Sequence, residues 1–252
     1  MKILKSWLND WIDIETISTD DISDALESLG FEIESRTDKT PNYKNITVGK
    51  VLEIYEHPNA DKVRVTKVDV GSKTYEIVCG AWNFDVGAVV PVALPKSEIK
   101  NGFKIDKRDI RGVESNGMIC SASELDLWDD HAGILKLSDE TKLGSDFSKI
   151  YNSTDTLWEI GVTPNRGDCM SHLGIARELS NYFNLTLKEN SQALKSNIQS
   201  VIKVNSGKIK ACNSYQSIEI ENFTLSDSNL NIRYRLSSIG VRVINNLSLI
   251  HI

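Results

Sequence analysis

Apolar residues near the N-terminus recur with the spacing of two short helices. Ser18 or Thr19 is placed to cap the second helix, and Gly30 is placed to end it. We therefore predict a small helical segment over residues 1–38. Its apolar positions are Trp7, Leu8, Trp11 and Ile12 in the first helix and Ile22, Ala25, Leu26 and Leu29 in the second.

After a polar linker at 39–45 the pattern changes to the alternation of β-strands, interrupted by Gly, Pro, Asn and Asp. Ser121 and Glu124 have the spacing of a capping box, which predicts one short inserted helix. Short strands with one helix in about 100 residues favour a closed barrel of the OB type, since closure removes exposed edges. The predicted strands are Ile46–Tyr55, Lys62–Val70, Tyr75–Cys79, Val89–Leu94, Arg108–Gly112 and Ile134–Leu137.

Helix and strand signals alternate in the rest of the chain. A strand over Thr156–Val162 leads into turn residues, and Asp168 is placed to cap a helix with an apolar side. A strand near Tyr215–Ile220 and a helix from Ser226 or Asp227 to Ser238, stopped by Gly240, follow. The apolar side of the helix after Asp168 consists of Met170, Leu173, Ala176, Leu179 and Phe183.

The fold class is therefore predicted as α+β. The final residues, 247–252, match the translation of a sequencing adapter, so we expect them to be an artefact and exclude them. The predicted divisions are a helical segment at 1–38, a barrel at 39–150, a connector with a packing helix at 151–210, and the start of a further domain at 211–246.

Charge is distributed unevenly. The net charge is −6, yet residues 1–38 hold ten acidic and three basic side chains, so the rest of the chain is nearly neutral. A local basic surface therefore remains compatible with the composition. No apolar run reaches the roughly 20 residues of a membrane span, and the N-terminus lacks the features of a signal peptide, which predicts a cytoplasmic protein without membrane contact. The four cysteines are widely spaced and are expected to be reduced thiols.

The chain contains no phosphate-binding loop, dinucleotide fingerprint, zinc-protease motif or nucleophile elbow. His57 precedes a proline and is expected to be a turn residue rather than a base. Asp129, Asp130 and His131 could bind a metal, but a solvated acidic loop is the favoured interpretation of this stretch. We therefore predict neither a catalytic centre nor a metal site.

Two polar stretches exceed this background. The first combines HPNADKV at 57–63 with SNGMICS at 115–121, where Asn, Asp, Lys and Ser at a barrel rim can bond nucleotides and Lys62 can meet a phosphate. The alternative is that these residues only build turns. Residues 96–111 add six basic side chains against three acidic ones, a candidate electrostatic footprint. These bases are Lys96, Lys100, Lys104, Lys107, Arg108 and Arg111.

The second stretch is TPNRGDCMSHLGIARE, at 163–178. Its polar turn lies against a helix start, where Arg166 and Asp168 can pair locally or dock another domain or chain. A rigid structural corner, with Asn165 as a third member, is favoured over direct contact with substrate.

These stretches, in this order, resemble the β subunits of bacterial phenylalanyl-tRNA synthetases. The resemblance includes KSWLNDWIDI, HPNADKVRVTKVDVG, EIVCGAWN, IRGVESNGMICSASELDL, VTPNRGDCMSHLGIARELS and RLSSIGVRVINN, and runs from residue 1 to about 246. The barrel motifs alone are shared with free-standing tRNA-binding barrels, whereas the NRGDC stretch is more specific. Trp82 and Phe84 depart from the pattern, in which smaller residues are common.

The resemblance implies a subunit of an ATP-dependent aminoacyl-tRNA synthetase. It implies a tRNA-binding OB domain followed by the start of a truncated editing domain. It also implies an α2β2 heterotetramer with an α subunit that performs most of the synthesis, and ATP and Mg²⁺ for the whole enzyme, neither bound by this part. The isolated chain is expected to be inactive. The alternative is a stand-alone tRNA-binding or chaperone-like barrel with no enzyme role.

The residues and the resemblance together define the candidate site residues. No catalytic residue is assigned. The tRNA-facing rim is predicted to consist of Asn59, Asp61, Lys62, Asn83, Ser115 and Met118, and the structural corner of Asn165, Arg166 and Asp168.

Overall fold

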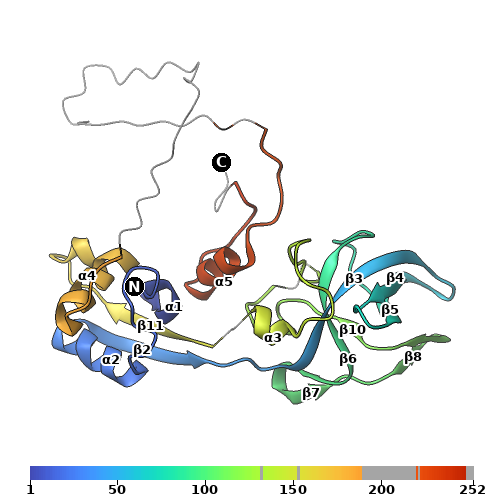
Figure 1. Ribbon diagram of the computed structural model, residues 1–252, viewed down its shortest axis with the longest axis horizontal. Helices are drawn as coiled ribbons and strands as arrows, with labels where there is room; N and C mark the ends of the chain where they lie inside the picture. The colour runs from blue at the N-terminus through green and yellow to red at the C-terminus, as the bar shows by residue number, and fades with distance from the viewer. Residues whose placement is uncertain (131–132, 152–153, 189–219, 221, 248–252) are drawn as a thin grey trace.

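The computed structural model describes residues 1–130, 133–151, 154–188, 220 and 222–247. Figure 1 shows two bodies side by side, with helix α5 (Leu230–Ser238) near their junction. We call residues 1–39 with 154–188 the helix–sheet body and residues 44–151 the six-strand body. The segment around Tyr215–Ile220, except for Ile220 itself, and residues 248–252 lie outside the described part of the chain.

The helix–sheet body is built from two segments that are far apart in the sequence. Its antiparallel sheet has the order β1-β11-β2, so β11 lies between two strands from the N-terminal segment. The elements are β1 (Lys2–Leu4), α1 (Lys5–Leu8), α2 (Thr19–Ser28), β2 (Glu32–Lys39), β11 (Asp155–Gly161), the 3₁₀ turn η2 (Gly167–Cys169) and α4 (His172–Phe183).

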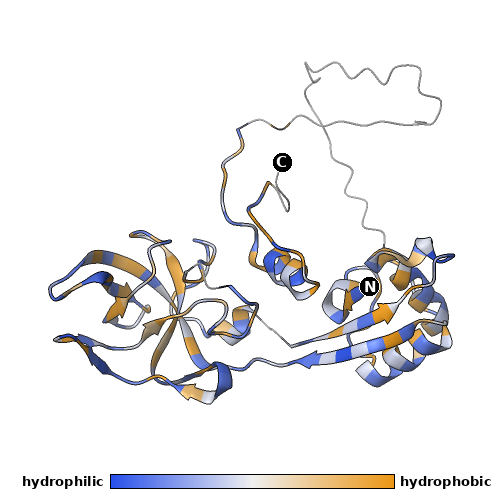
Figure 2. Cartoon of the chain, turned by 180° about the vertical axis from the view of Figure 1, so that it is seen from behind, coloured by the Kyte–Doolittle hydropathy of each residue, from blue (hydrophilic) through white to orange (hydrophobic). Residues whose placement is uncertain are grey.

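The prediction that residues 1–38 are only helical is wrong, because this segment also contains the strands β1 and β2. Lys2–Leu4 is too short to show an alternation. Glu32–Lys39 is almost entirely exposed, so it has no apolar face that a pattern could reveal; Figure 2 shows this strand in mostly hydrophilic colours. Both strands are held by backbone pairing with β11, as in the register Leu157 opposite Thr37. The predicted strand at 156–162 is confirmed as β11.

The predicted second helix is confirmed as α2. The Ser18 hydroxyl accepts a hydrogen bond from the backbone N–H of Asp21 at 3.0 Å, as expected for an N-cap. Gly30 follows the helix with a φ of 87°, a conformation that favours glycine. The face with Ile22 and Leu26 is fully buried. This face packs into the core of the helix–sheet body.

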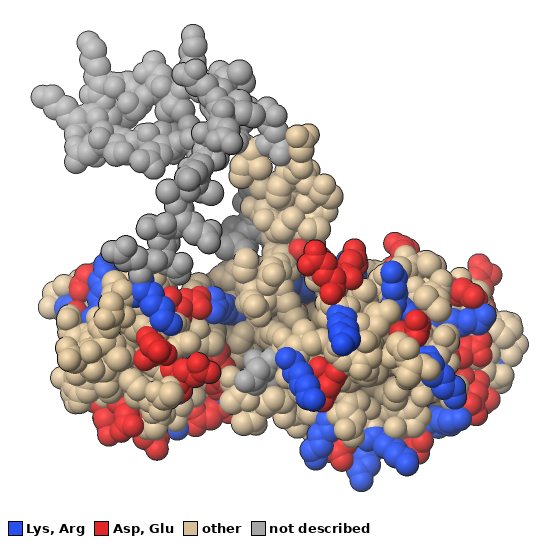
Figure 3. Space-filling view, in the orientation of Figure 1, with Lys and Arg blue, Asp and Glu red and all other residues tan. Residues whose placement is uncertain are grey.

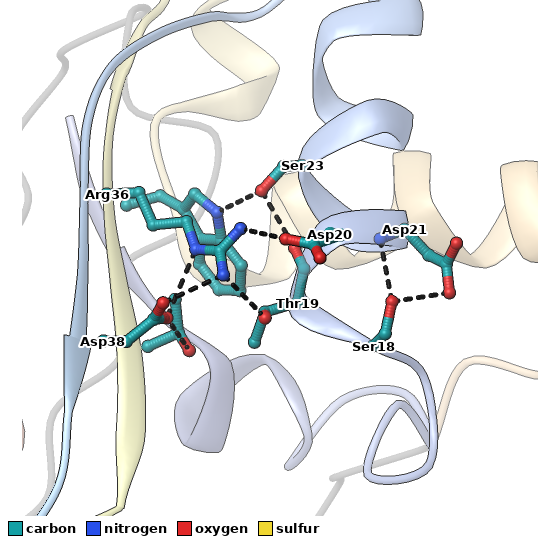
Figure 4. A network of polar contacts seen from close by, with 9 residues as sticks. Ser18, Thr19, Asp20, Asp21, Ser23, Arg36 and Asp38 are labelled. Atoms are coloured by element: carbon teal, nitrogen blue, oxygen red, sulfur yellow. Dashed lines mark hydrogen bonds and ion pairs between the residues drawn. The ribbon is translucent and has the colours of Figure 1, made fainter.

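Arg36 joins β2 to the first turn of α2 (Figure 4). Its guanidinium donates to Asp20 at 2.5 Å, to Thr19 Oγ1 at 2.9 Å and to Asp38 at 2.9 Å. Asp38 also accepts from Thr156 Oγ1 on β11 at 2.9 Å. The hydrogen bond from Arg36 lowers the pKa of Asp38. These contacts fix α2 against the sheet.

Trp158 lies at the centre of this body. Its side chain is fully buried, and its indole N–H donates to Ser23 Oγ at 2.9 Å, so its single polar atom is satisfied. Because Trp158 comes from β11 and Ser23 from α2, one core unites the predicted N-terminal segment with the predicted connector.

The six-strand body contains a sheet with the path β10-β6-β3-β4-β5, and β7 pairs with β6. Asn116, just before β10, donates its N–H to the carbonyl of Glu76 on β5 at 2.8 Å, so the two ends of the path approach each other. The elements are β3 (Lys44–His57), β4 (Ala60–Asp69), β5 (Thr74–Cys79), β6 (Val89–Ile99), the 3₁₀ turn η1 (Lys100–Gly102), β7 (Phe103–Lys104), β8 (Arg108–Ile110), β9 (Val113–Ser115), β10 (Met118–Ile119) and α3 (Phe147–Ile150).

The first five predicted strands of this body are confirmed, the fifth as β8 of a short hairpin, whereas two further predictions are wrong. Residues 134–137 form no strand; they make isolated backbone bonds, such as Leu135 N–H to the carbonyl of Cys120 at 2.9 Å. The capping box exists, since Glu124 accepts from the Ser121 N–H at 2.6 Å, but only turns follow it. Asp126 has a φ of 55°, which ends the right-handed conformation.

Three consecutive residues of α5 contact different parts of the molecule. Arg233 donates to Asp130 in the six-strand body at 3.4 Å. The Tyr234 ring meets Tyr151 edge-on, 5.6 Å between centroids. Arg235 donates twice to Asp10 in the helix–sheet body, at 2.5 and 3.0 Å. The predicted helix and its end at Ser238 before Gly240 are confirmed, but the predicted start at Ser226 or Asp227 is wrong, because Asn229 caps the helix.

Candidate nucleic-acid interface

The rim begins where the β3–β4 turn meets the β8–β9 hairpin. Asn59 Nδ2 donates to the carbonyl of Arg111 at 2.9 Å. His57 Nδ1 accepts from the Asn59 N–H at 3.1 Å, so its Nε2–H donates to the carbonyl of Ile110 at 2.8 Å. His57 therefore builds the turn, as the sequence predicted, and Asn59 connects the two loops.

Asp61 and Lys62 follow on β4, and both are exposed. Neither side chain forms an ion pair with another residue in the part of the chain that the structure describes. The Lys62 ammonium is therefore available to an external phosphate.

Asn83 and Ser115 form hydrogen bonds with the backbone of the protein itself. The Asn83 amide donates to the carbonyl of Ile134 at 2.9 Å and accepts from the N–H of the same residue at 3.0 Å. Ser115 is buried; its hydroxyl accepts from Val78 N–H and donates to the Gly117 carbonyl, both at 3.0 Å. These two predicted rim residues shape the loops around the surface.

Met118 lines a cavity of about 810 Å³ at the same end of the sheet. Trp82, a departure from the family pattern that was not among the predicted rim residues, lines it too, with 62% of its surface exposed. A tryptophan in a polar turn after a strand was the signal that could have identified it. The other lining residues are Val78, Cys79, Gly80, Ala81, Asn83, Ile119, Ser121, Glu124, Gly133 and Ile134.

The basic segment at 96–111 is partly neutralised. Lys100 pairs with Asp126 at 2.8 Å, and Lys107 pairs with Glu114 at 3.3 Å. Figure 3 shows Lys and Arg side chains gathered at the lower edge of the six-strand body, where β7 lies in Figure 1. Acidic side chains are interspersed among them, so this edge is a mixed rather than a uniformly positive surface.

The second stretch forms a corner in the helix–sheet body. The Arg166 guanidinium donates to Asp168 at 3.0 Å, pairs with Glu178 at 2.9 Å and lies 5.6 Å from the Phe31 ring centroid. The hydrogen bond from Arg166 lowers the pKa of Asp168 to about 2. The predicted local pair is therefore present, while Asn165 is exposed beside it.

This corner overturns the predicted helix cap and contains a cluster of potential metal ligands. Asp168 does not cap the following helix; the Ser171 hydroxyl does, accepting from Gly174 N–H at 3.0 Å, because η2 intervenes. Asp168, Cys169 and Glu178 each place a potential metal-ligand atom within 4.8 Å of the others. Arg166 already supplies their cation, and a thiol is a poor ligand for Mg²⁺. The set therefore does not fit the Mg²⁺ that the resemblance implies.

The rim, the curled sheet and the match to a family model together define the class of this part of the chain. Residues 46–146 match the family described as "Putative tRNA binding domain". The six-strand body is a tRNA-binding domain of mixed helix and sheet content. None of the described helices is both long and apolar enough to cross a membrane.

Relatives identify the chain more closely. It is 34% identical over 250 residues to the phenylalanine–tRNA ligase beta subunit of Syntrophus aciditrophicus. The matched region covers 98% of this chain and 31% of that protein. The same subunit of Fusobacterium nucleatum is 34% identical over 252 residues, with coverage of 98% and 31%. That of Burkholderia lata is 45% identical over 185 residues, 71% of this chain and 23% of the relative.

The chain is therefore a homologue of phenylalanine–tRNA ligase beta subunits, components of an aminoacyl-tRNA synthetase, and the resemblance is confirmed along nearly all of it. It spans about 31% of the length of these two relatives. The match extends well beyond the tRNA-binding domain, which favours the ligase-subunit interpretation over a stand-alone barrel.

Proposed function

We propose that the chain is part of the β subunit of a phenylalanine–tRNA ligase and that its six-strand body is an OB-type barrel that binds tRNA. The observation that carries this proposal is similarity to such subunits over 98% of the chain, with a tRNA-binding domain at its centre. In the whole enzyme this part contributes tRNA contact and subunit assembly.

Strand order supports the OB assignment. In OB folds the loops between strands one and two and between strands four and five border the surface that binds oligonucleotides. Here the corresponding segments are the β3–β4 turn and the stretch between β6 and β10, which the Asn59–Arg111 bond joins. Lys62 at this rim meets a phosphate, and Asp61 and Met118 border the same surface. Asn83 and Ser115 hold the loops in place.

The remaining functions of the enzyme are assigned elsewhere. ATP and Mg²⁺ serve the whole enzyme, a cytoplasmic heterotetramer of two α and two β subunits, and neither is bound by this part of the chain. The corner of Asn165, Arg166 and Asp168 keeps the helix–sheet body rigid for assembly. Residues 211–246 begin the editing domain, after the barrel at 39–150 and the segment 151–210, whose described part shares one core with residues 1–38. The chain alone does not charge tRNA.

Binding of phenylalanine tRNA at several salt concentrations tests the proposal. Affinity falls steeply with salt if phosphates are contacted, and Lys62→Ala makes the logarithmic slope shallower by about one unit. Lys142→Ala is the matched control, since Lys142 is also exposed but lies beside the start of β3, at the other end of the sheet. Salt-independent binding, or equal slopes for both variants, contradicts phosphate contact by Lys62.

Assembly is tested separately. The chain is expected to co-purify with the α subunit and to show no aminoacylation by itself. Charging of tRNA by the isolated chain would refute the assignment of synthesis to the partner. A homodimer that does not bind the α subunit would support a stand-alone module instead.

A further inference from the structure

Trp82 is the one exposed tryptophan among the five in the chain. The Arg64 guanidinium lies 4.7 Å from its ring centroid and 4.6 Å from that of Phe84. Arg64 is fixed there, because it also donates to the carbonyls of Ala81 and Phe84 at 2.9 and 3.1 Å. Arg64 thus holds the large Trp82 ring at the surface and restricts its motion.

The cavity beside Trp82 has the size and lining of a small-ligand site. Val78, Met118 and Ile134 supply apolar wall. The Glu124 carboxylate also lines it, oriented by hydrogen bonds from the Ser121 N–H at 2.6 Å and hydroxyl at 2.8 Å. A carboxylate repels a phosphate but accepts hydrogen bonds from base N–H groups, including the N3–H of uracil, so this lining suits a nucleobase rather than the sugar–phosphate backbone.

A cation for the backbone lies next to the cavity. In the β4–β5 register Arg64 is opposite Cys79. A methyl group built on Gly80 would lie 3.9 Å from the Lys62 carbonyl, so Lys62 borders the turn that carries Trp82. Lys62 is two residues before Arg64 on β4, so a basic side chain lies on each side of Val63 beside this turn.

We propose that Trp82 is the stacking platform for one unpaired nucleobase of RNA, with the base entering the cavity beside Met118 and the adjoining phosphate lying on Lys62. This inference rests on the proposed tRNA binding and names the part of the ligand that this end of the barrel holds. Base–aromatic stacking tolerates any sequence, because every base has a π face. The site therefore selects single-stranded RNA over a helix, in which the bases are already stacked.

A thermodynamic cycle with the full chain tests the proposal. The probes are a fluorescein-labelled ten-nucleotide oligo(U) RNA and an abasic oligonucleotide of the same length, measured by anisotropy at low salt. Trp82→Ala is expected to weaken oligo(U) binding about tenfold, within the range for loss of one stacked base. The same substitution is expected to leave binding of the abasic probe within about twofold, because no base is there to stack.

Phe103→Ala is the matched control. Phe103 is also exposed, at 48%, and also lies under a guanidinium, 5.3 Å from Arg108, but it does not line the cavity. It is expected to retain wild-type affinity for both probes. Trp82→Phe is expected to restore part of the affinity, and equal unfolding midpoints for all variants show that the fold is intact.

The outcomes separate the two proposals. If the wild-type chain binds tRNA with a steep salt dependence but Trp82→Ala binds oligo(U) like the wild type, the stacking platform is wrong and tRNA binding stands. Equal losses for Trp82→Ala and Phe103→Ala, or equal losses on both probes, overturn the platform as well. If the wild-type chain binds no RNA at low salt, both proposals fall.

Discussion

We expect the helix–sheet body to lose stability in mild acid because His172 is buried there as a neutral imidazole. Only 8% of its surface is exposed, its ring stacks on Trp7 with centroids 4.1 Å apart, and its Nε2 accepts from Leu4 N–H at 3.2 Å. Burial, followed by the nearby Arg235, lowers the pKa of His172 from 6.5 to about 4. Protonation therefore removes an acceptor and places a charge in the core.

The sign follows from the direction of this shift. The unfolded chain binds the proton near pH 6.5, whereas the folded chain resists it until about pH 4. The stabilising contribution is complete above the unfolded pKa and is lost as the pH falls through this window. Linkage gives a loss of about 2 kcal/mol at pH 5, a large fraction of the stability of a small body.

His172→Gln is the matched variant, since glutamine offers the Leu4 N–H an acceptor that cannot take up a proton. Urea unfolding is followed by tryptophan fluorescence, because Trp7, Trp11 and Trp158 all lie in this body. The free energy of unfolding is expected to fall between about pH 7.5 and pH 5 by about 2 kcal/mol more in the wild type than in the variant.

Two observations would refute this reasoning. One is an equal loss of stability in the wild type and His172→Gln, which would place the acid sensitivity in other groups. The other is an imidazole NMR resonance of His172 that titrates near the ordinary value of 6.5 in the folded chain. Either result would mean that burial against Trp7 and Leu4 does not make the imidazole resist protonation.

Two further predictions concern contacts at α4 and α5. Gly174→Ala is expected to destabilise the chain by more than about 2 kcal/mol, although alanine favours helices, because its Cβ would lie 2.0 Å from the Asp168 carbonyl oxygen; an unchanged urea midpoint would contradict this close approach. Arg235→Lys is expected to speed hydrogen exchange in α5 about fivefold, since lysine cannot reproduce the two bonds to Asp10, a difference of about 1 kcal/mol. Exchange at the wild-type rate would show that the two bonds from Arg235 to Asp10 do not hold α5 in place.

The sequence predicted those parts of the fold whose side chains divide into a buried and an exposed set. The strands from β3 to β6 carry apolar residues that are buried in a core, and α2 carries both a cap and an apolar stripe. β2 carries no such division, so only its pairing with β11 defines it. That pairing joins residues more than 100 positions apart, which no local pattern encodes.

The candidate rim shows the same limit at the level of single side chains. Sequence composition marked Asn59, Asn83 and Ser115 as polar groups near a rim, but their hydrogen-bond partners depend on loops that meet only in the fold. Residue type also predicted a capping box at Ser121, and the local bonds formed without a helix because Asp126 turns the chain. Trp82 was visible as an unusual residue, and its significance required the cavity and Arg64 beside it.

The position of β11 between β1 and β2 determines the order in which the nascent chain folds. During synthesis β2 emerges first, and its partner begins 116 residues later, at Asp155, after the whole six-strand body. At about 5–20 residues per second, β2 waits unpaired for roughly 6 to 23 s. The strand that waits is Glu-Ile-Glu-Ser-Arg-Thr-Asp-Lys, whose charges discourage pairing with other chains. The polar composition of β2, which left no apolar pattern to predict the strand, thus discourages aggregation of the nascent chain. Meanwhile the six-strand body folds before the helix–sheet body, whose two segments flank it in the sequence.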